Sequence, residues 1–183
     1  MSVLHTLISS RAMALGELYQ DTPTWPAGSL FTDGDITVGH KSLTGLAAER
    51  GTPCVLIAPS GTGQPGEEYR TIVIATILSC TPRGRWWHPM ELTVDCDLRV
   101  LDGRVLDTVL LQRPNARHRK TVLVHAADQQ SMIRAWLPEA ATPNDLVALA
   151  SVGTIALGQI ALHPTRNATG TDDDTQRQGR CLK

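Results

Sequence analysis

The sequence predicts an α+β fold in which a small antiparallel β-barrel or sheet of about five strands follows one helix and precedes two more. Three observations support this prediction. Short β-branched and apolar runs, separated by turns rich in glycine and proline, fill the middle of the chain. Apolar residues at helical spacing mark its beginning, and two apolar segments with helix-like boundaries mark its end. The 183 residues suffice for one domain with a sizeable core.

The same patterns divide the chain into four segments. Residues 1–29 are expected to form an N-terminal helix and linker, residues 30–125 the β core, residues 126–163 a pair of helices, and residues 164–183 a flexible polar tail. The tail is expected to be flexible because it has almost no apolar residue to bury. In layout alone, and without a sequence signature, the β core resembles the small barrels of the SH3 or OB type.

Each element of the first half follows from a local pattern. Residues 2–20 repeat apolar side chains every three or four positions, which predicts an amphipathic helix. Residues 54–58 form a short apolar run, typical of a strand. Residues 70–78 are β-branched on both faces, which predicts a central strand. Between these two, residues 59–68 read as a long hairpin loop, since they lack the Gly-Lys-Ser/Thr ending of a phosphate-binding loop.

Residues 91–101 show the clearest strand pattern. Apolar residues alternate there with polar ones, which predicts one buried and one wet face. Asp102-Gly103 is a favoured type I′ pair, so we expect a hairpin in which Val100 faces Val105 and Cys96 faces Val109. Residues 121–125 then supply a further strand.

The last apolar segments are predicted to be helical. Thr142 suits an N-cap, Pro143 the first helical position and Asp145 the first turn of a helix that runs to about residue 163. Residues 146–162 carry no charge. This run is short for a membrane span, and its apolar residues are interrupted by polar residues and glycines. We therefore expect a buried helix or one packed in an oligomer.

Composition narrows the class of protein. The net charge of −1 argues against a generally polyanion-binding surface, so a nucleic-acid role would need a local patch. The four cysteines form no Cys-x-x-Cys pair, which favours free thiols in a reducing cytoplasm. The N-terminus lacks a positively charged signal region. Fourteen arginines against three lysines are typical of a GC-rich bacterial or phage gene.

Two basic connections are the best candidates for partner binding. The first, PRGRWWHPM, holds two of the four tryptophans between two prolines, and the second, RPNARHRK, adds more cations. Aromatic rings stack on bases while arginines neutralise phosphates, as in single-stranded nucleic-acid binding. The predicted hairpin brings both connections to one end of the sheet, opposite Asp102-Gly103. The candidate residues are Arg83, Arg85, Trp86, Trp87, His88, Arg113, Arg117, His118, Arg119 and Lys120.

The leading hypothesis is therefore a non-enzymatic binding module for an anionic partner, either nucleic acid or an acidic protein surface, with no cofactor, metal or membrane contact. A second hypothesis is a phage-like or homo-oligomeric assembly protein that associates through its helices, because small residues in 146–162 allow close approach: Gly153, Ala156, Gly158 and Ala161. A third is a small metal-dependent hydrolase that uses Asp95 and Asp97 on the wet strand face. The sequence assembles no complete catalytic constellation.

Overall fold

A computed structural model describes residues 24–32, 34–61, 68–82, 89–113, 119–138 and 140–162. These residues form ten strands, two α-helices and one 3₁₀ turn. The strands are β1 (Leu30–Thr32), β2 (Asp35–Val38), β3 (Lys41–Ser42), β4 (Cys54–Pro59), β5 (Tyr69–Thr81), β6 (Met90–Val94), β7 (Val105–Leu110), β8 (Arg119–Ala126), β9 (Met132–Pro138) and β10 (Leu146–Val152). The helices are α2 (Leu43–Arg50) and α3 (Leu157–Ile160), and the 3₁₀ turn is η1 (Arg99–Leu101).

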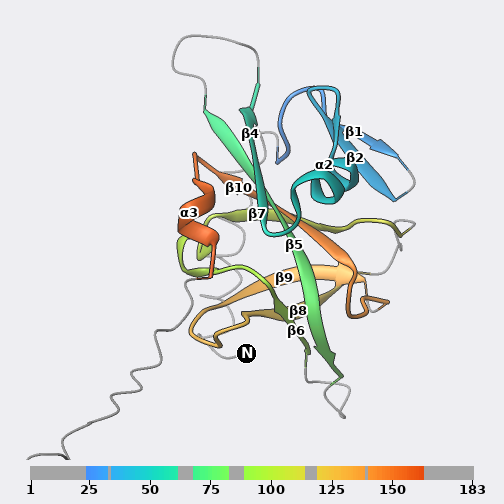
Figure 1. Ribbon diagram of the computed structural model, residues 1–183, viewed down its shortest axis with the longest axis vertical. Coiled ribbons are helices and arrows are strands. Elements are labelled where there is room, and N and C mark those ends of the chain that lie inside the picture. The colour runs from blue at the N-terminus through green and yellow to red at the C-terminus, as the bar shows by residue number, and fades with distance from the viewer. Residues whose placement is uncertain are drawn as a thin grey trace, which may run out of the picture.

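Seven strands form one nearly closed, barrel-like sheet in the order β7-β10-β5-β6-β8-β9, with β4 added to β5 (Figure 1). Strand β5 has 13 residues and crosses the centre of the molecule. One of its edges pairs with β10, and the other pairs first with β4 and then with β6. All pairs in this sheet are antiparallel except β6 with β8, which is parallel.

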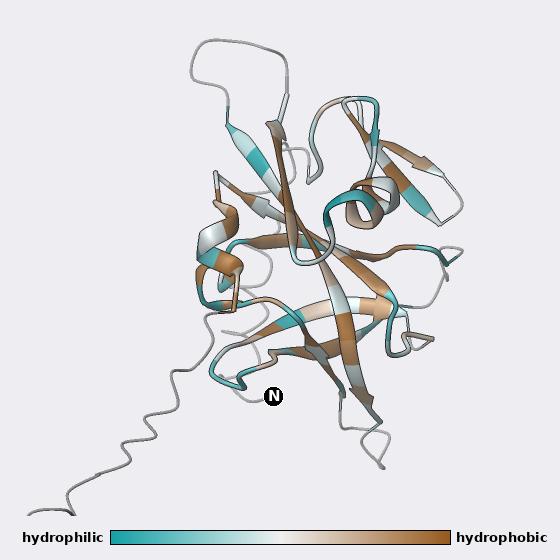
Figure 2. Cartoon of the chain, viewed as in Figure 1, coloured by the Kyte–Doolittle hydropathy of each residue, from teal (hydrophilic) through white to brown (hydrophobic). Residues whose placement is uncertain are grey.

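The two faces of the sheet bury separate cores. The barrel interior is filled by alternate residues of its strands, such as Val73, Leu92, Val124 and Leu149. The opposite residues of β5 and β10, such as Ile72, pack under α2 and the small β1–β2–β3 sheet. Figure 2 shows the resulting hydrophobic colouring along β4 and β5. Because both faces of β5 are covered, its sequence is apolar throughout its middle, as predicted for a central strand.

Asp95 continues the hydrogen bonding along one edge of β5 at the point where the neighbouring strand changes from β4 to β6. Its N–H donates to the Thr76 carbonyl at 3.2 Å, and its carboxylate accepts the Thr76 N–H at 2.8 Å. The Thr52 hydroxyl donates to the other carboxylate oxygen at 2.6 Å. The side chain thus takes the place of a backbone carbonyl at a break that would otherwise leave polar groups unsatisfied.

The barrel closes at a seam between β7 and β9. In the part of the chain that the structure describes, no backbone ladder joins these two strands. Thr108 bridges them: its hydroxyl donates to the Trp136 carbonyl at 2.9 Å and accepts the Trp136 N–H at 3.2 Å. Thr108 is only 2% exposed, so these bonds are shielded from water and satisfy backbone groups at the edge of β9.

The predicted α+β fold with two C-terminal helices is wrong: 52% of the described residues are in strands and 12% in helices. Residues 126–163 hold β9, β10 and the one-turn helix α3. In β9, exposed and buried residues alternate, so its period is two. Strand β10 is apolar on both sides because it lies between β5 and β7, and a short apolar run cannot distinguish a buried strand from a buried helix.

The predicted helix start at Thr142 is a turn. The Thr142 N–H and hydroxyl both donate to the Asp145 carboxylate, at 2.7 and 3.0 Å, as in a cap. Asn144 then adopts a φ of 72°, which no helix continues, and the chain enters β10. The small residues of 146–162 therefore do not form one helix face: Gly153 follows β10 at φ 78° and Ala156 precedes α3.

The predicted Asp102-Gly103 hairpin is also wrong, although its turn exists. Asp102 has φ −60° and ψ 127°, Gly103 has φ 67°, and the Arg104 N–H donates to the Leu101 carbonyl. These values describe a type II turn, whose twist splays two-residue hairpins instead of joining them. Strand β6 ends at Val94, and β7 pairs with β10. Leu98 and Leu101 enter the barrel core instead of continuing a strand.

Several other expectations are confirmed. The strands predicted at residues 54–58, 70–78 and 121–125 lie within β4, β5 and β8, and β4 and β5 form the predicted hairpin. Cys54, Cys80 and Cys96 are free thiols.

The predicted N-terminal helix at residues 2–20 and the predicted tail at residues 164–183 lie outside the described residues. No helix within the described ranges is both long and apolar enough to cross a membrane.

We expect Thr108→Val to lower the free energy of unfolding by about 1–3 kcal/mol, because the isosteric change leaves buried groups of the seam unsatisfied. Urea unfolding followed by circular dichroism measures the change. Thr121→Val on the exposed face of β8 is the matched control and should stay within about 0.5 kcal/mol of the native chain. Equal effects of the two substitutions would contradict the role assigned to Thr108.

Candidate functional site

The two basic connections are bounded by strand ends that lie at one end of the barrel. Strands β6 and β8 run parallel, with Met90 beside Val122, so both begin at the same end. Strand β5 finishes there opposite the start of β6, and β9 finishes there with Pro138 beside Arg119. We call this the β6–β8 end. The strand ends that bound the two connections therefore share one end of the barrel. The reason is the parallel pairing of β6 with β8 and not the Asp-Gly hairpin that the sequence led us to expect.

Most of the predicted partner-binding residues lie outside the described part of the chain: Arg83, Arg85, Trp86, Trp87, His88, Arg117 and His118. The structure places Arg113, Arg119 and Lys120. Arg119 and Lys120 are the first residues of β8, and Arg113 follows β7.

Arg113 is bound within the fold. Its Nε donates to the Asp145 carboxylate at 3.1 Å, and its NH2 group donates to the Thr142 hydroxyl at 2.6 Å. These bonds tie the end of β7 to the turn that leads into β10. Arg113 therefore has a structural contact that accounts for its charge.

Arg119 lies at the rim of the barrel seam. Its guanidinium donates to the Asp107 carboxylate at 2.9 Å, and the other oxygen of Asp107 accepts the indole N–H of Trp25 at 2.8 Å. The Arg119 side chain remains 33% exposed. An exposed pair of this kind contributes only about 0–1 kcal/mol, so it orients the guanidinium without withdrawing it from an incoming anion.

A groove of about 510 Å³ lies along the seam, between the facing edges of β7 and β9. Its polar lining includes Arg119, Arg134 and Asp107, and Trp136 forms part of its wall. Trp136 is 62% exposed, although a large aromatic ring is usually at least half covered. It projects from β9 opposite Thr121, near the β6–β8 end. The seam groove thus combines two cations with an accessible indole.

Sequence analysis did not select Trp136 or Arg134, because it placed both in a helix. The signal was present in residues 132–137, MIRAWL, where apolar and outward-facing positions alternate. Reading that alternation as a strand puts Met132, Arg134 and Trp136 on one face. These residues lie near Arg119 because β9 pairs with β8, and the local sequence pattern does not predict that pairing.

The two carboxylates proposed for a metal-dependent hydrolase have other partners. Asp95 is bonded to Thr52 and Thr76 as described above. Asp97 is 5% exposed and accepts bonds from the Arg99 Nε at 2.8 Å and from the Arg99 N–H at 2.9 Å. Among the residues that the structure places, no three His, Cys, Asp or Glu side chains gather where they could hold a metal ion.

Comparison with known proteins gives no family for this chain: no family model matches it, and no curated protein matches it significantly.

The pKa of Asp97 is lowered from its ordinary value of 3.8, chiefly by the hydrogen bonds from the Arg99 side chain, although burial opposes the shift. A carboxylate with a lowered pKa in the folded state stabilises the fold above its unfolded pKa, and this contribution is lost as the pH falls through the folded pKa. We therefore expect urea stability to fall between about pH 5 and pH 2, and less steeply in Asp97→Asn. Asp102→Asn, on an exposed turn, should keep the native pH dependence. An unchanged slope in Asp97→Asn would contradict the assignment.

Proposed function

We propose that this protein is a non-enzymatic binding module that takes single-stranded nucleic acid along the seam groove, at the β6–β8 end of the barrel. The observation that carries the proposal is the exposed indole of Trp136 in a groove that also holds Arg119 and Arg134. Free thiols at three described cysteines support a reducing, cytoplasmic setting for this module.

The proposal follows from what each group can do. A base can stack on an exposed indole, a contact worth about 1–3 kcal/mol that tolerates any sequence. Guanidinium groups bind phosphate with paired, directional donors, better than the point charge of a lysine. Arg119 uses one nitrogen for Asp107, which leaves further donors. With a net charge of −1, the chain has no general attraction for polyanions, so binding depends on this local site.

The position of the groove adds to the argument. Two connections rich in arginine, tryptophan and histidine join strands whose described ends lie at the β6–β8 end. Trp136 lies near that end, opposite Thr121 in the strand that begins with Arg119 and Lys120. The proposed surface therefore lies at the end of the barrel where the described ends of these strands meet.

Trp136→Ala tests the stacking contact. We expect it to weaken binding of a fluorescein-labelled oligothymidine of about 15 nucleotides roughly 5- to 150-fold at low salt, as the loss of one stacked base requires. Fluorescence anisotropy measures the affinity. Trp136 is exposed, so the variant should keep the native circular dichroism. No binding by the native chain at low salt, or equal binding by the variant, would refute the proposal.

Arg134→Ala tests the phosphate contact through its salt dependence. Each phosphate contact on a single strand contributes about 0.7 to the slope of log K against log salt concentration, so the slope should fall by about that amount. Arg104→Ala is the matched control, since this exposed arginine precedes β7 at the opposite end of the barrel. The control should bind as the native chain does. An equal loss in both variants would show that only overall charge matters.

A further inference from the structure

A second surface lies on the other side of β5, at the open edge of β4. The Ser60 N–H donates to the Glu68 carbonyl at 2.8 Å, which makes this pair a hydrogen-bonded one. Hydrogen-bonded and non-bonded pairs alternate along antiparallel strands, so Cys54, Leu56 and Ala58 direct their backbone groups toward β5. Val55 and Ile57 therefore direct their N–H and C=O groups away from it. No described residue pairs with these four groups.

The middle of this edge lacks the features that usually protect an edge strand, although β4 ends in Pro59, whose C=O accepts the Ala27 N–H at 3.2 Å. Between Pro53 and Pro59 the sequence is Cys-Val-Leu-Ile-Ala, with no charge, proline or glycine. Natural edge strands carry such residues because a bare edge is a template for another strand. The open part of the edge is therefore confined to residues 55–57, and its unprotected apolar sequence indicates a surface that another strand covers.

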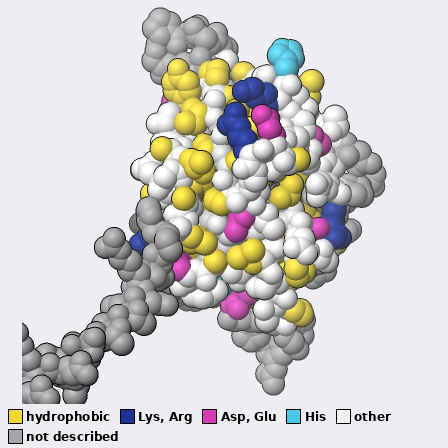
Figure 3. All heavy atoms as spheres, viewed as in Figure 1, with side chains coloured by type: hydrophobic (Ala, Val, Ile, Leu, Met, Phe, Trp, Pro, Cys, Tyr) yellow, Lys and Arg dark blue, Asp and Glu magenta, His cyan; other side chains and the backbone are white. Residues whose placement is uncertain are grey.

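An apolar groove of about 320 Å³ runs beside the edge, between β4 and α3. Two apolar side chains that line it are exposed, Ile57 at 43% and Leu157 at 49%. Figure 3 shows hydrophobic side chains on the face that carries β4 and α3. Strand addition commonly combines free main-chain groups with a neighbouring pocket for alternate side chains.

We propose that this edge binds the same edge of a second copy of this chain, so that two β4 strands pair antiparallel about a two-fold axis at Leu56. In that register Val55 lies opposite Ile57 of the second copy. Both residues direct their N–H and C=O groups outward, so two such pairs satisfy all four free groups on each chain. The strand is thus self-complementary, as a two-fold interface requires.

Charge also favours this occupant. Thr52 and Ser60 flank β4, so the two-fold axis brings Thr52 to the end of the interface where Ser60 of the second copy lies, and Ser60 is paired with Glu68 in its own hairpin. Arg50, which lines the groove, lies two residues before Thr52. Each end of the paired strands therefore brings Arg50 of one chain toward the hairpin of the other that carries Glu68, whose exposed carboxylate also accepts from its own Arg70 at 3.1 Å. The apolar centre brings no like charges together.

The first test is the mass of the full chain by sedimentation velocity over about 1–100 µM, where a dimer is expected. Ile57→Pro removes one outward N–H per chain and leaves the bonds between β4 and β5 in place, since proline is tolerated at such edge positions. It should raise the dimer dissociation constant about tenfold or more. Ile57→Lys should do the same by placing a charge on the apolar face.

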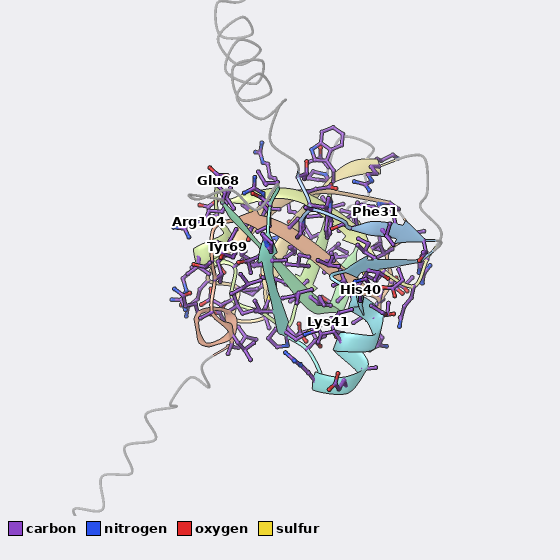
Figure 4. All side chains as sticks on the ribbon, turned by 90° about the horizontal axis from the view of Figure 1, so that it is seen from above. Phe31, His40, Lys41, Glu68, Tyr69 and Arg104 are labelled. Carbon is purple, nitrogen blue, oxygen red and sulfur yellow. The ribbon has the colours of Figure 1, made fainter. Side chains whose placement is uncertain are left out.

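Leu30→Lys is the matched control. Leu30 is an apolar residue of β1 that is 64% exposed. Figure 4 shows its neighbour Phe31 on the other side of the molecule from Tyr69, so the control lies away from the β4 edge. It should leave the dimer unchanged.

A cysteine at the axis tests the register and does not depend on how well the proline variant folds. Leu56 faces its own copy in a non-bonded pair with Cα atoms about 4.5 Å apart, within the range of a disulfide. Leu56→Cys should therefore cross-link the native dimer under oxidised glutathione, and Leu30→Cys should not. A monomer at every concentration, including one that binds an extended apolar peptide, would overturn the proposal. So would a dimer that both Ile57 variants leave intact, or one that Leu56→Cys fails to cross-link.

Discussion

The architecture depends on the requirement that every backbone group of β5 finds a partner. Its 13 residues span about 43 Å at ~3.3 Å per residue, longer than any one neighbouring strand. One edge is therefore shared between β4 and β6, and the carboxylate of Asp95 spans the break between them. This sharing places β4 outside the barrel and β6 within it, and so separates the two surfaces proposed above.

Closure of the barrel creates the seam groove. Strands β7 and β9 are the last in the sheet order, and the Thr108 side chain joins them without a ladder. A ladder would bring the strands to about 4.8 Å and close the gap. Because a side chain spans it instead, Arg119, Arg134 and Trp136 line a groove where the two edge strands face each other. The same irregularity thus stabilises the fold and forms the proposed binding surface.

The two proposed surfaces are chemically distinct. The seam groove is polar and cationic, and its exposed ring suits a ligand with charge and flat faces. The β4 edge is apolar, and its Val55 and Ile57 backbone groups have no strand partner among the described residues, which suits another strand. The proposed dimer leaves the seam groove of each chain open, because β4 lies on β5 and not on β7 or β9. One assembled particle could therefore present two grooves to a single extended partner, which would increase its effective affinity.

The sequence by itself determined those features that depend on neighbouring residues. The β-branched run of residues 70–78 required a covered strand, the alternation after Glu91 buried Leu92, Val94, Cys96 and Leu98, and Gly103 required a turn. Apart from the hairpin of β4 and β5, the tertiary structure alone decided which strands pair. The run of residues 146–152 became a strand because β5 and β7 lie on either side of it, and β6 pairs with β8 in parallel while β7 pairs with β10. Local periodicity shows whether a residue is buried, but it does not show which strand buries it. For this reason the place of Trp136 in the seam groove and the outer edge of β4 could be found only in the tertiary structure.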